Sequence, residues 1–329
     1  MALGALRVTT AVTLAGLAVA AVGVGLRWNA TPGGGAPPAP AGSRHMGEWF
    51  VEYQRPLAPP AKLSVMVTAA YGCIVRVTGP VDALGLHDRA EIGEYRGALP
   101  DEEAEALRAQ AGPAILAARA PAEALDTGES LVTLSSGEIG KPADKNGFVP
   151  LSAPPPPEVA RFEKSMLDLA RLLVAHPFAV LKGKAASAWK DGAPEVTLDI
   201  ENPGSATAEC ANPAAGAQAL PLQLVLQREV PDDQLEPDDS VMFALAAGEA
   251  AQTGRGAPAR GQAAPPHLRL AHGERATFVL RPQRHLRLSP GRYAVRVVAS
   301  FADVPGGTGT TAVTGSLYVP AGTLQVGGK

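Results

Sequence analysis

Arginines cluster in the C-terminal part of this sequence, where they could form a binding site. Guanidinium groups on one surface attract anionic polymers such as cell-envelope glycans, and they also attract lipid head groups. Over residues 255–296, Glu274 is the one acid among nine arginines: Arg255, Arg260, Arg269, Arg275, Arg281, Arg284, Arg287, Arg292 and Arg296. Strand alternation in "GRYAVRVVASF" places Arg296 on the face opposite Tyr293 and Val295. We therefore expect a candidate binding surface made of Arg281, Arg284, Arg287, Arg292 and Arg296.

Two other interpretations of these arginines stay open. They could keep an exposed sheet edge from aggregating. They could also pair with an acidic loop, "PDDQLEPDDS", over residues 231–240. That loop could bind calcium through several carboxylate oxygens, or it could be a solvated connection between strands.

The two cysteines, Cys73 and Cys210, are too few for a disulfide framework or a Cys-x-x-Cys site. Export from the cytoplasm would permit one disulfide between them. Cys73 lies in an apolar, strand-like run, a context that instead favours a buried and inert thiol.

No sequence motif of an enzyme or of a cofactor site occurs. The chain lacks GxSxG, HExxH, GxxxxGK[ST] and DxDxDG patterns, and its six histidines include no pair at i and i+4. The glycine-rich run at 306–311 has no helix pattern after it and is typical of a hairpin loop. We expect no catalytic residue, metal or cofactor, although a triad can assemble from distant residues.

The N-terminus predicts export. After Arg7 the chain has no charged residue over 8–26, a run that ends at Arg27 and Trp28. Residues 1–28 are a cleaved signal peptide or a membrane anchor, and a span needs roughly 20 such residues. Residues 29–45 follow as a spacer rich in Pro, Gly and Ala. Either interpretation places the rest of the chain outside the cytoplasm, while a net charge of -3 argues against nucleic acid as a partner.

Residues 46–176 predict a small α+β domain. Apolar and β-branched runs indicate one or two strands over 63–79 and further strands at 90–97, 129–138 and 147–152, with Asn146-Gly147 as a turn. An acidic helix begins after Pro100 and should end at Gly112-Pro113. A second helix is predicted before His176-Pro177 from an apolar stripe at helical spacing: Val159, Phe162, Met166, Leu169 and Leu173.

From 177 onward the pattern is that of strands between turn clusters, without a helical period. In "EVTLDIE" the apolar residues Val196, Leu198 and Ile200 alternate with polar ones. About seven strands over 177–322 predict an immunoglobulin-like β-sandwich, followed by a tail over 323–329.

One stretch carries a resemblance to a known family. The run "GERATFVLRPQRHLRLSPGRYAVRVVASF" resembles the last hairpin of bacterial immunoglobulin-like and fibronectin-type modules, where Leu-x-Pro-Gly-x-Tyr opens the penultimate strand. It is also similar to bacterial Ig-like proteinase inhibitors, and the match covers roughly 150 C-terminal residues. The resemblance implies that Tyr293 hydrogen-bonds to upstream backbone. The inter-sheet disulfide of antibody domains does not carry over, because position 295 is Val.

These observations favour an exported, membrane-tethered envelope protein that acts as a non-enzymatic binding or structural module. Its expected partners are the membrane, through the N-terminal segment, and an envelope protein or an anionic glycan. Two alternatives stay open. One is a proteinase inhibitor that uses a sandwich loop, "EPDDSVMF" or "DVPGGTGTT"; the other is an envelope hydrolase with its site in the α+β domain.

Overall fold

The structure is a computed structural model of the whole sequence. Most of the described chain in it is β structure. The predicted signal or anchor and the spacer lie outside the described residues. The structure describes residues 49–57, 61–68, 72–80, 84, 90–118, 130–139, 141–215, 222–230, 240–246, 248–254, 257–258, 262–282, 288–302, 304 and 307–327.

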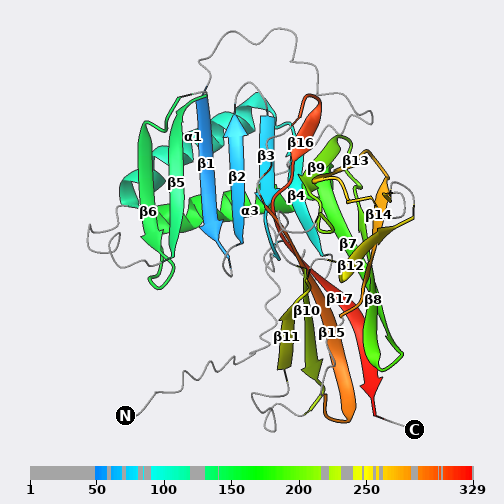
Figure 1. The fold of residues 1–329 in the computed structure, drawn as a ribbon. Coiled ribbons are helices and arrows are strands. Elements are labelled where there is room, and N and C mark those ends of the chain that lie inside the picture. Colours follow the sequence, from blue (N-terminus) through cyan, green and yellow to red (C-terminus); the bar gives the residue numbers. More distant parts are fainter. Residues whose placement is uncertain are drawn as a thin grey trace.

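The N-terminal part contains six strands and both helices of the described chain (Figure 1). The run at 63–79 forms two strands that pair with each other. In chain order the elements are β1 (Trp49–Pro56), β2 (Lys62–Thr68), β3 (Gly72–Val77), β4 (Glu91–Gly97), α1 (Asp101–Ala117), β5 (Leu131–Glu138), β6 (Lys145–Pro150) and α3 (Pro157–Leu173).

Helix α1 does not end where the sequence predicted. It continues through Gly112-Pro113 to Ala117, so the predicted stop was wrong. Gly112 has no Cβ to clash with the proline ring, which relieves the usual restriction on the residue before proline. Ala111, Ala114 and Ile115 are buried on both sides of this point, and their packing holds the helix together.

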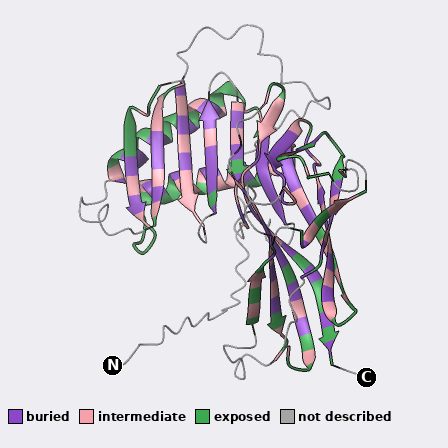
Figure 2. Cartoon of the chain, viewed as in Figure 1, coloured by how far each residue is buried: buried purple, intermediate pink, exposed green. Residues whose placement is uncertain are grey.

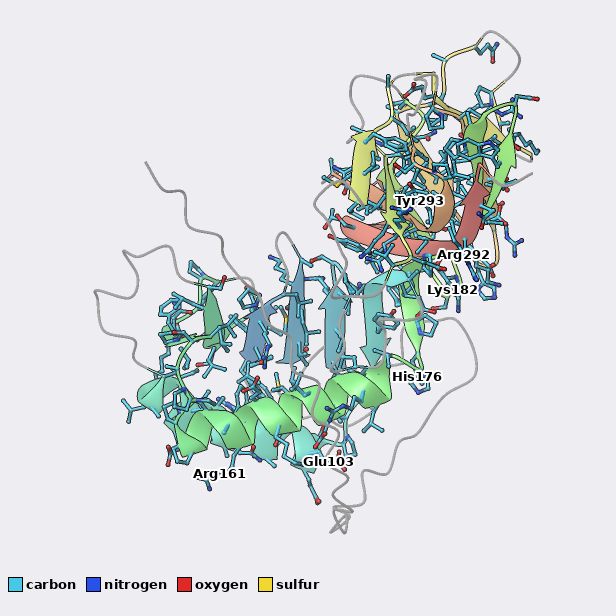
Figure 3. All side chains as sticks on the ribbon, turned by 90° about the horizontal axis from the view of Figure 1, so that it is seen from below. Glu103, Arg161, His176, Lys182, Arg292 and Tyr293 are labelled. Carbon is cyan, nitrogen blue, oxygen red and sulfur yellow. The ribbon has the colours of Figure 1, made fainter. Side chains whose placement is uncertain are left out.

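The predicted stripe of helix α3 is confirmed. All five of its apolar residues are buried, and they pack in one hydrophobic core with the sheet. Arg161 lies on the outer side of the helix (Figure 3), whereas Glu163 faces the sheet. The helix therefore forms because it can bury one face on the strands.

The predicted turn at Asn146-Gly147 was also wrong. Both residues lie in β6, where Asn146 pairs with Ser135 and Gly147 with Leu134 of β5. A Cβ at Gly147 would lie 2.7 Å from Ala118 Cβ and 2.8 Å from the Ile115 carbonyl oxygen. The glycine is thus explained by the close approach of α1 to the sheet.

From residue 177 onward the described elements are all strands, as predicted, but they number eleven rather than about seven. They are β7 (Pro177–Lys190), β8 (Ala193–Glu201), β9 (Thr207–Ala211), β10 (Gln223–Arg228), β11 (Ser240–Ala244), β12 (Ala250–Thr253), β13 (His267–Leu270), β14 (Arg275–Leu280), β15 (Gly291–Phe301), β16 (Thr310–Ala312) and β17 (Gly315–Val326). Residues 323–326 pair with β15 as part of β17, so the predicted tail was wrong for these residues.

The strands form three sheets. The long sheet has ten strands in the order β12-β14-β8-β7-β4-β3-β2-β1-β5-β6. The short sheet has the order β11-β10-β15-β17, and a third sheet has the order β13-β9-β16. Antiparallel pairing of β4 with β7 makes the long sheet continuous across the predicted boundary at 176/177.

The helices and the short sheet cover opposite faces of the long sheet. Val180 belongs to the core beneath the helices, and its neighbour Leu181 belongs to the core shared with the short sheet. Adjacent residues of a strand point to opposite faces, so the two cores lie on opposite sides. Figure 3 shows the helices below the sheet and the sandwich rising on the other side. The two cores divide near residue 177, but β4 and β7 contribute to both.

Candidate binding surface

The structure separates the arginines that the sequence grouped. Arg281 follows β14 in the long sheet and pairs with Glu195. Arg292 and Arg296 lie on β15 of the short sheet, where they point outward from the core that holds Tyr293 and Val295. β14 and β15 are neighbours in sequence but belong to different sheets, so the described arginines do not share one sheet face. Their use as a binding surface stays a prediction. Arg284 and Arg287 lie outside the described residues.

Arg292 is itself engaged in an ion pair. Its Nε lies 2.8 Å from Glu229 Oε2, with 62% of the arginine side chain exposed. An exposed pair of this kind contributes little to stability. Arg292 and Arg296 keep the outward orientation that strand alternation predicts.

Arg269 and His267, which also lie within residues 255–296, contact a buried carboxylate. Glu209 of β9 is fully buried. Its carboxylate accepts hydrogen bonds from Thr310 Oγ1 at 2.5 Å, Arg269 Nε at 2.9 Å and the Gly307 amide at 3.1 Å, and His267 Nδ1 lies 3.1 Å away. These bonds, that of Thr310 foremost, lower the pKa of Glu209 to about 2. Glu209 thus anchors the described part of the glycine-rich loop to the third sheet.

Tyr293 occupies the corner that the family resemblance implied. Its side chain is buried, and its hydroxyl donates a hydrogen bond to the Ser289 carbonyl oxygen at 2.9 Å. The bond joins the start of β15 to the turn that precedes it, next to Arg292 (Figure 3).

The two cysteines are not bonded to each other. Both are free and buried, Cys73 in the core beneath the helices and Cys210 in the sandwich core. Burial raises the pKa of the Cys73 thiol to about 12, with a contribution from Glu103, and burial also raises the pKa of Cys210. The buried thiol that the sequence favoured at Cys73 is confirmed, and the possible disulfide with Cys210 is not formed, because the two cysteines lie in separate cores.

A different surface, which the sequence did not predict, is the face of the six N-terminal strands opposite the helices. We call it the open face. No described helix or strand lies over its central part (Figures 1 and 3). Its residues are Phe50, Glu52, Gln54, Ser64, Met66, Thr68, Ile74, Arg76, Glu94, Arg96, Thr133, Ser135, Asn146 and Phe148. Four of its residues, Ser64, Thr68, Glu94 and Ser135, are buried, and the others are half-buried or exposed (Figure 2). Along each strand the residues of the open face alternate with those beneath the helices.

Strand register arranges the open face in rows. One row runs Asn146, Ser135, Glu52, Met66, Ile74 and Arg96 across β6, β5, β1, β2, β3 and β4. The adjacent row runs Phe148, Thr133, Gln54, Ser64, Arg76 and Glu94 across the same strands. Six strands make this surface about 24 Å wide.

Hydrogen bonds fix several polar side chains of the open face. Ser64 Oγ donates to Glu52 Oε1 at 2.6 Å, across the β1–β2 pair. Ser135 Oγ donates to Asn146 Oδ1 at 2.9 Å, across the β5–β6 pair. The face therefore combines oriented polar groups with half-buried apolar ones, namely Phe50, Met66, Ile74 and Phe148.

Three charged side chains of the open face form ion pairs at β4, the strand that pairs with β7 of the sandwich. Glu94, which is only 4% exposed, lies between two arginines. Arg76 Nε donates to its Oε2 at 2.8 Å, and Arg96 Nε donates to its Oε1. The Arg96 guanidinium also stacks on Phe178 of β7, with Cζ 3.7 Å from the ring centroid. We call these residues the arginine corner: Arg76, Glu94, Arg96 and Phe178.

The opposite face of the same strands has its own polar contacts, which tie it to helix α3. Tyr53 donates to Glu163 Oε1 at 2.6 Å, and Arg55 binds the same oxygen. Burial, followed by the hydrogen bond to Glu163, raises the pKa of Tyr53. These groups hold the helix on the sheet, so the titratable residues of this side serve packing.

Several predicted features lie partly or wholly outside the described residues. Of the acidic loop, Ser240 is the one described residue, and the loop "DVPGGTGTT" is described at 304 and 307–311. In the described ranges no three His, Cys, Asp or Glu side chains are placed to hold a metal ion. Neither α1 nor α3 is long and apolar enough to span a membrane, and the search covered the described residues alone.

Comparison with known proteins adds no relative. No family model matches the chain, and no curated protein or solved structure shows significant similarity to it. The function must therefore be inferred from the surfaces of the molecule itself.

Proposed function

We propose that this chain is an exported, membrane-tethered protein of the cell envelope that binds a partner without catalysing a reaction. The open face is the binding surface. The N-terminal strands and helices act as an α+β domain, and the C-terminal sandwich acts as an immunoglobulin-like module beside it.

The observation that carries this proposal is the one-sided covering of the six N-terminal strands. The helices bury one face, while the other presents half-buried Phe, Met and Ile side chains among oriented Ser, Asn, Glu and Arg groups. Mixed surfaces with partly exposed apolar side chains are typical of protein interaction sites. The sandwich rises beside β4 on the same side (Figure 3), so it borders the proposed surface.

The sequence supports the location. An uncharged run over 8–26 and a Pro, Gly and Ala-rich spacer precede the first described strand. In this proposal the run anchors the chain and the spacer holds the folded part away from the membrane.

Affinity capture with two matched methionine variants tests the proposal. The full chain would carry a C-terminal tag, because β17 ends remote from β1 (Figure 1). It would be incubated with the detergent-solubilised envelope of its own cells. Met66→Lys places a charge on the open face, and Met242→Lys places the same charge on the outer face of the short sheet, where Met242 is 65% exposed.

We expect Met66→Lys to lose the protein that the wild type captures, while Met242→Lys retains it. Thermal unfolding would check that both variants are folded. Equal capture by the wild type and Met66→Lys would contradict the proposal, as would loss confined to Met242→Lys.

A further inference from the structure

We infer that the arginine corner binds a carboxylate of the partner, and that the partner presents it on an extended peptide segment with apolar side chains. This inference rests on the proposed function, because it assigns a ligand chemistry to the same open face.

The two guanidinium groups are oriented before any ligand arrives. Each donates through Nε to a different oxygen of Glu94, and the Glu94 side chain is 6% exposed. Arg96 is held further by its stacking on Phe178. Side chains that are already fixed lose less conformational freedom on binding, which favours affinity.

Both arginines keep donors for a ligand. The contacts with Glu94 use the Nε–H group of each arginine. The N–H groups on the two Nη atoms are the donors that would bind a ligand carboxylate. The side chains remain 51% and 41% exposed for Arg76 and Arg96 respectively. They belong to adjacent strands, with Arg76 opposite Glu94 and Arg96 opposite Ile74, which makes the arginines diagonal neighbours.

The arginine corner carries a net positive charge, which favours the binding of an anion. Two arginines face one glutamate, which leaves one positive charge uncompensated among these residues. On the same row the next acidic residue is Glu52, separated from Arg96 by Met66 and Ile74 and hydrogen-bonded to Ser64. A carboxylate from a ligand would supply the missing negative charge.

The neighbours of the corner indicate a peptide rather than a glycan. Ile74 lies opposite Arg96, and Met66 lies opposite Ile74, both half-buried on the open face. A ligand bound to Arg96 along this row would also cover these two apolar side chains. A polypeptide can present a carboxylate beside apolar side chains, whereas an anionic glycan offers carboxylates among hydroxyl groups.

The test measures the binding of a defined probe to the full chain. The probe is a short fluorescent peptide in which Glu and Leu alternate, and fluorescence anisotropy reports its binding. We expect the double variant Arg76→Gln/Arg96→Gln to weaken binding by about tenfold or more. The matched double variant Arg292→Gln/Arg296→Gln removes the same charge from the short sheet, and its affinity should stay within about twofold of the wild type.

Two further measurements distinguish binding by oriented arginines from nonspecific electrostatic attraction. Unlabelled peptide should displace the probe, whereas an oligogalacturonate of equal charge or inorganic phosphate at equal concentration should not. Glu94→Gln raises the positive charge but removes the orienting carboxylate, so it should weaken binding of the probe. Thermal unfolding of each variant would identify those that fail to fold, and only folded variants are compared.

Equal weakening by the two double variants, absence of probe binding to the wild type, or tighter binding by Glu94→Gln would overturn the inference. Displacement of the probe by oligogalacturonate as effectively as by peptide would also overturn it. Its failure differs from failure of the proposed function, because Met66→Lys could still abolish capture of the native partner when the probe does not bind.

Discussion

Gly183 of β7 lies directly beneath Val319 of β17. A Cβ built on Gly183 would lie 2.4 Å from Val319 Cγ2, closer than side-chain atoms approach one another. The missing side chain lets the short sheet pack against the long one on the side away from the helices. This contact therefore helps to place the sandwich beside the open face.

Substitution of Gly183 by Ala should destabilise the protein by overpacking. We expect Gly183→Ala to lower the free energy of unfolding by about 1–3 kcal/mol, because the valine cannot move without disturbing its neighbours. Val319→Ala alone removes apolar contacts, but combined with Gly183→Ala it should recover part of the loss. Chemical denaturation of the two single variants and the double variant measures this coupling, and strictly additive effects would contradict the assigned contact.

Tyr293→Phe should cost about 1 kcal/mol of unfolding free energy, because it removes the hydrogen bond to the Ser289 carbonyl and keeps the ring. Tyr318→Phe is the matched control on the paired strand β17, since no hydrogen bond of the Tyr318 hydroxyl is found within the described ranges. Urea denaturation compares the two variants. A Tyr293→Phe protein as stable as the control would show that the corner bond contributes nothing.

Glu209 should make the protein sensitive to acid. Hydrogen bonds lower its pKa in the folded state from the ordinary 4.5 to about 2. Its stabilising contribution is therefore fully present above about pH 4.5 and is lost as the pH falls toward about 2. We expect Glu209→Gln to be less stable than the wild type at neutral pH, with a smaller further loss over this acid window.

The control for Glu209→Gln is Glu138→Gln, which removes a carboxylate that is 58% exposed. Unfolding free energies at several pH values between about 2 and about 6 would be compared. Equal pH dependence of the wild type and Glu209→Gln would contradict the assigned role of Glu209.

Both cysteines should resist alkylation in the native protein. Their thiols are buried, and the pKa of Cys73 is raised to about 12, so little thiolate forms at neutral pH. We expect no labelling by iodoacetamide under native, unreduced conditions and labelling of both residues after denaturation without a reductant. Mass spectrometry reads out the result, and a denatured protein that stays unlabelled until it is reduced would indicate a disulfide.

Local patterns in the sequence predicted the elements that bury one face. The stripe from Val159 to Leu173 predicted α3, and alternation in "EVTLDIE" predicted β8, because burial imposes a period on apolar residues. Where glycine or proline had a tertiary role the prediction failed. Pro113 lies inside α1, and Gly147 allows α1 to pack closely against the sheet.

The arginine corner could not be predicted, because it depends on which strands are neighbours. Arg76 and Arg96 lie on different strands and meet through the β3–β4 register. Arg281 and Arg292 are closer in sequence but belong to different sheets. The strand pairing, which no local pattern reveals, places the two arginines on one face.

Site-specific photocrosslinking in intact cells would show whether the open face binds the partner. A photoreactive amino acid would replace Gln54 on the open face or, as the matched control, Gln223 on the outer face of the short sheet. Both glutamines are half-buried in their strands. We predict a discrete crosslinked protein adduct with the probe at position 54 and none at position 223. An adduct at position 223 alone, or none at either position, would contradict binding at the open face.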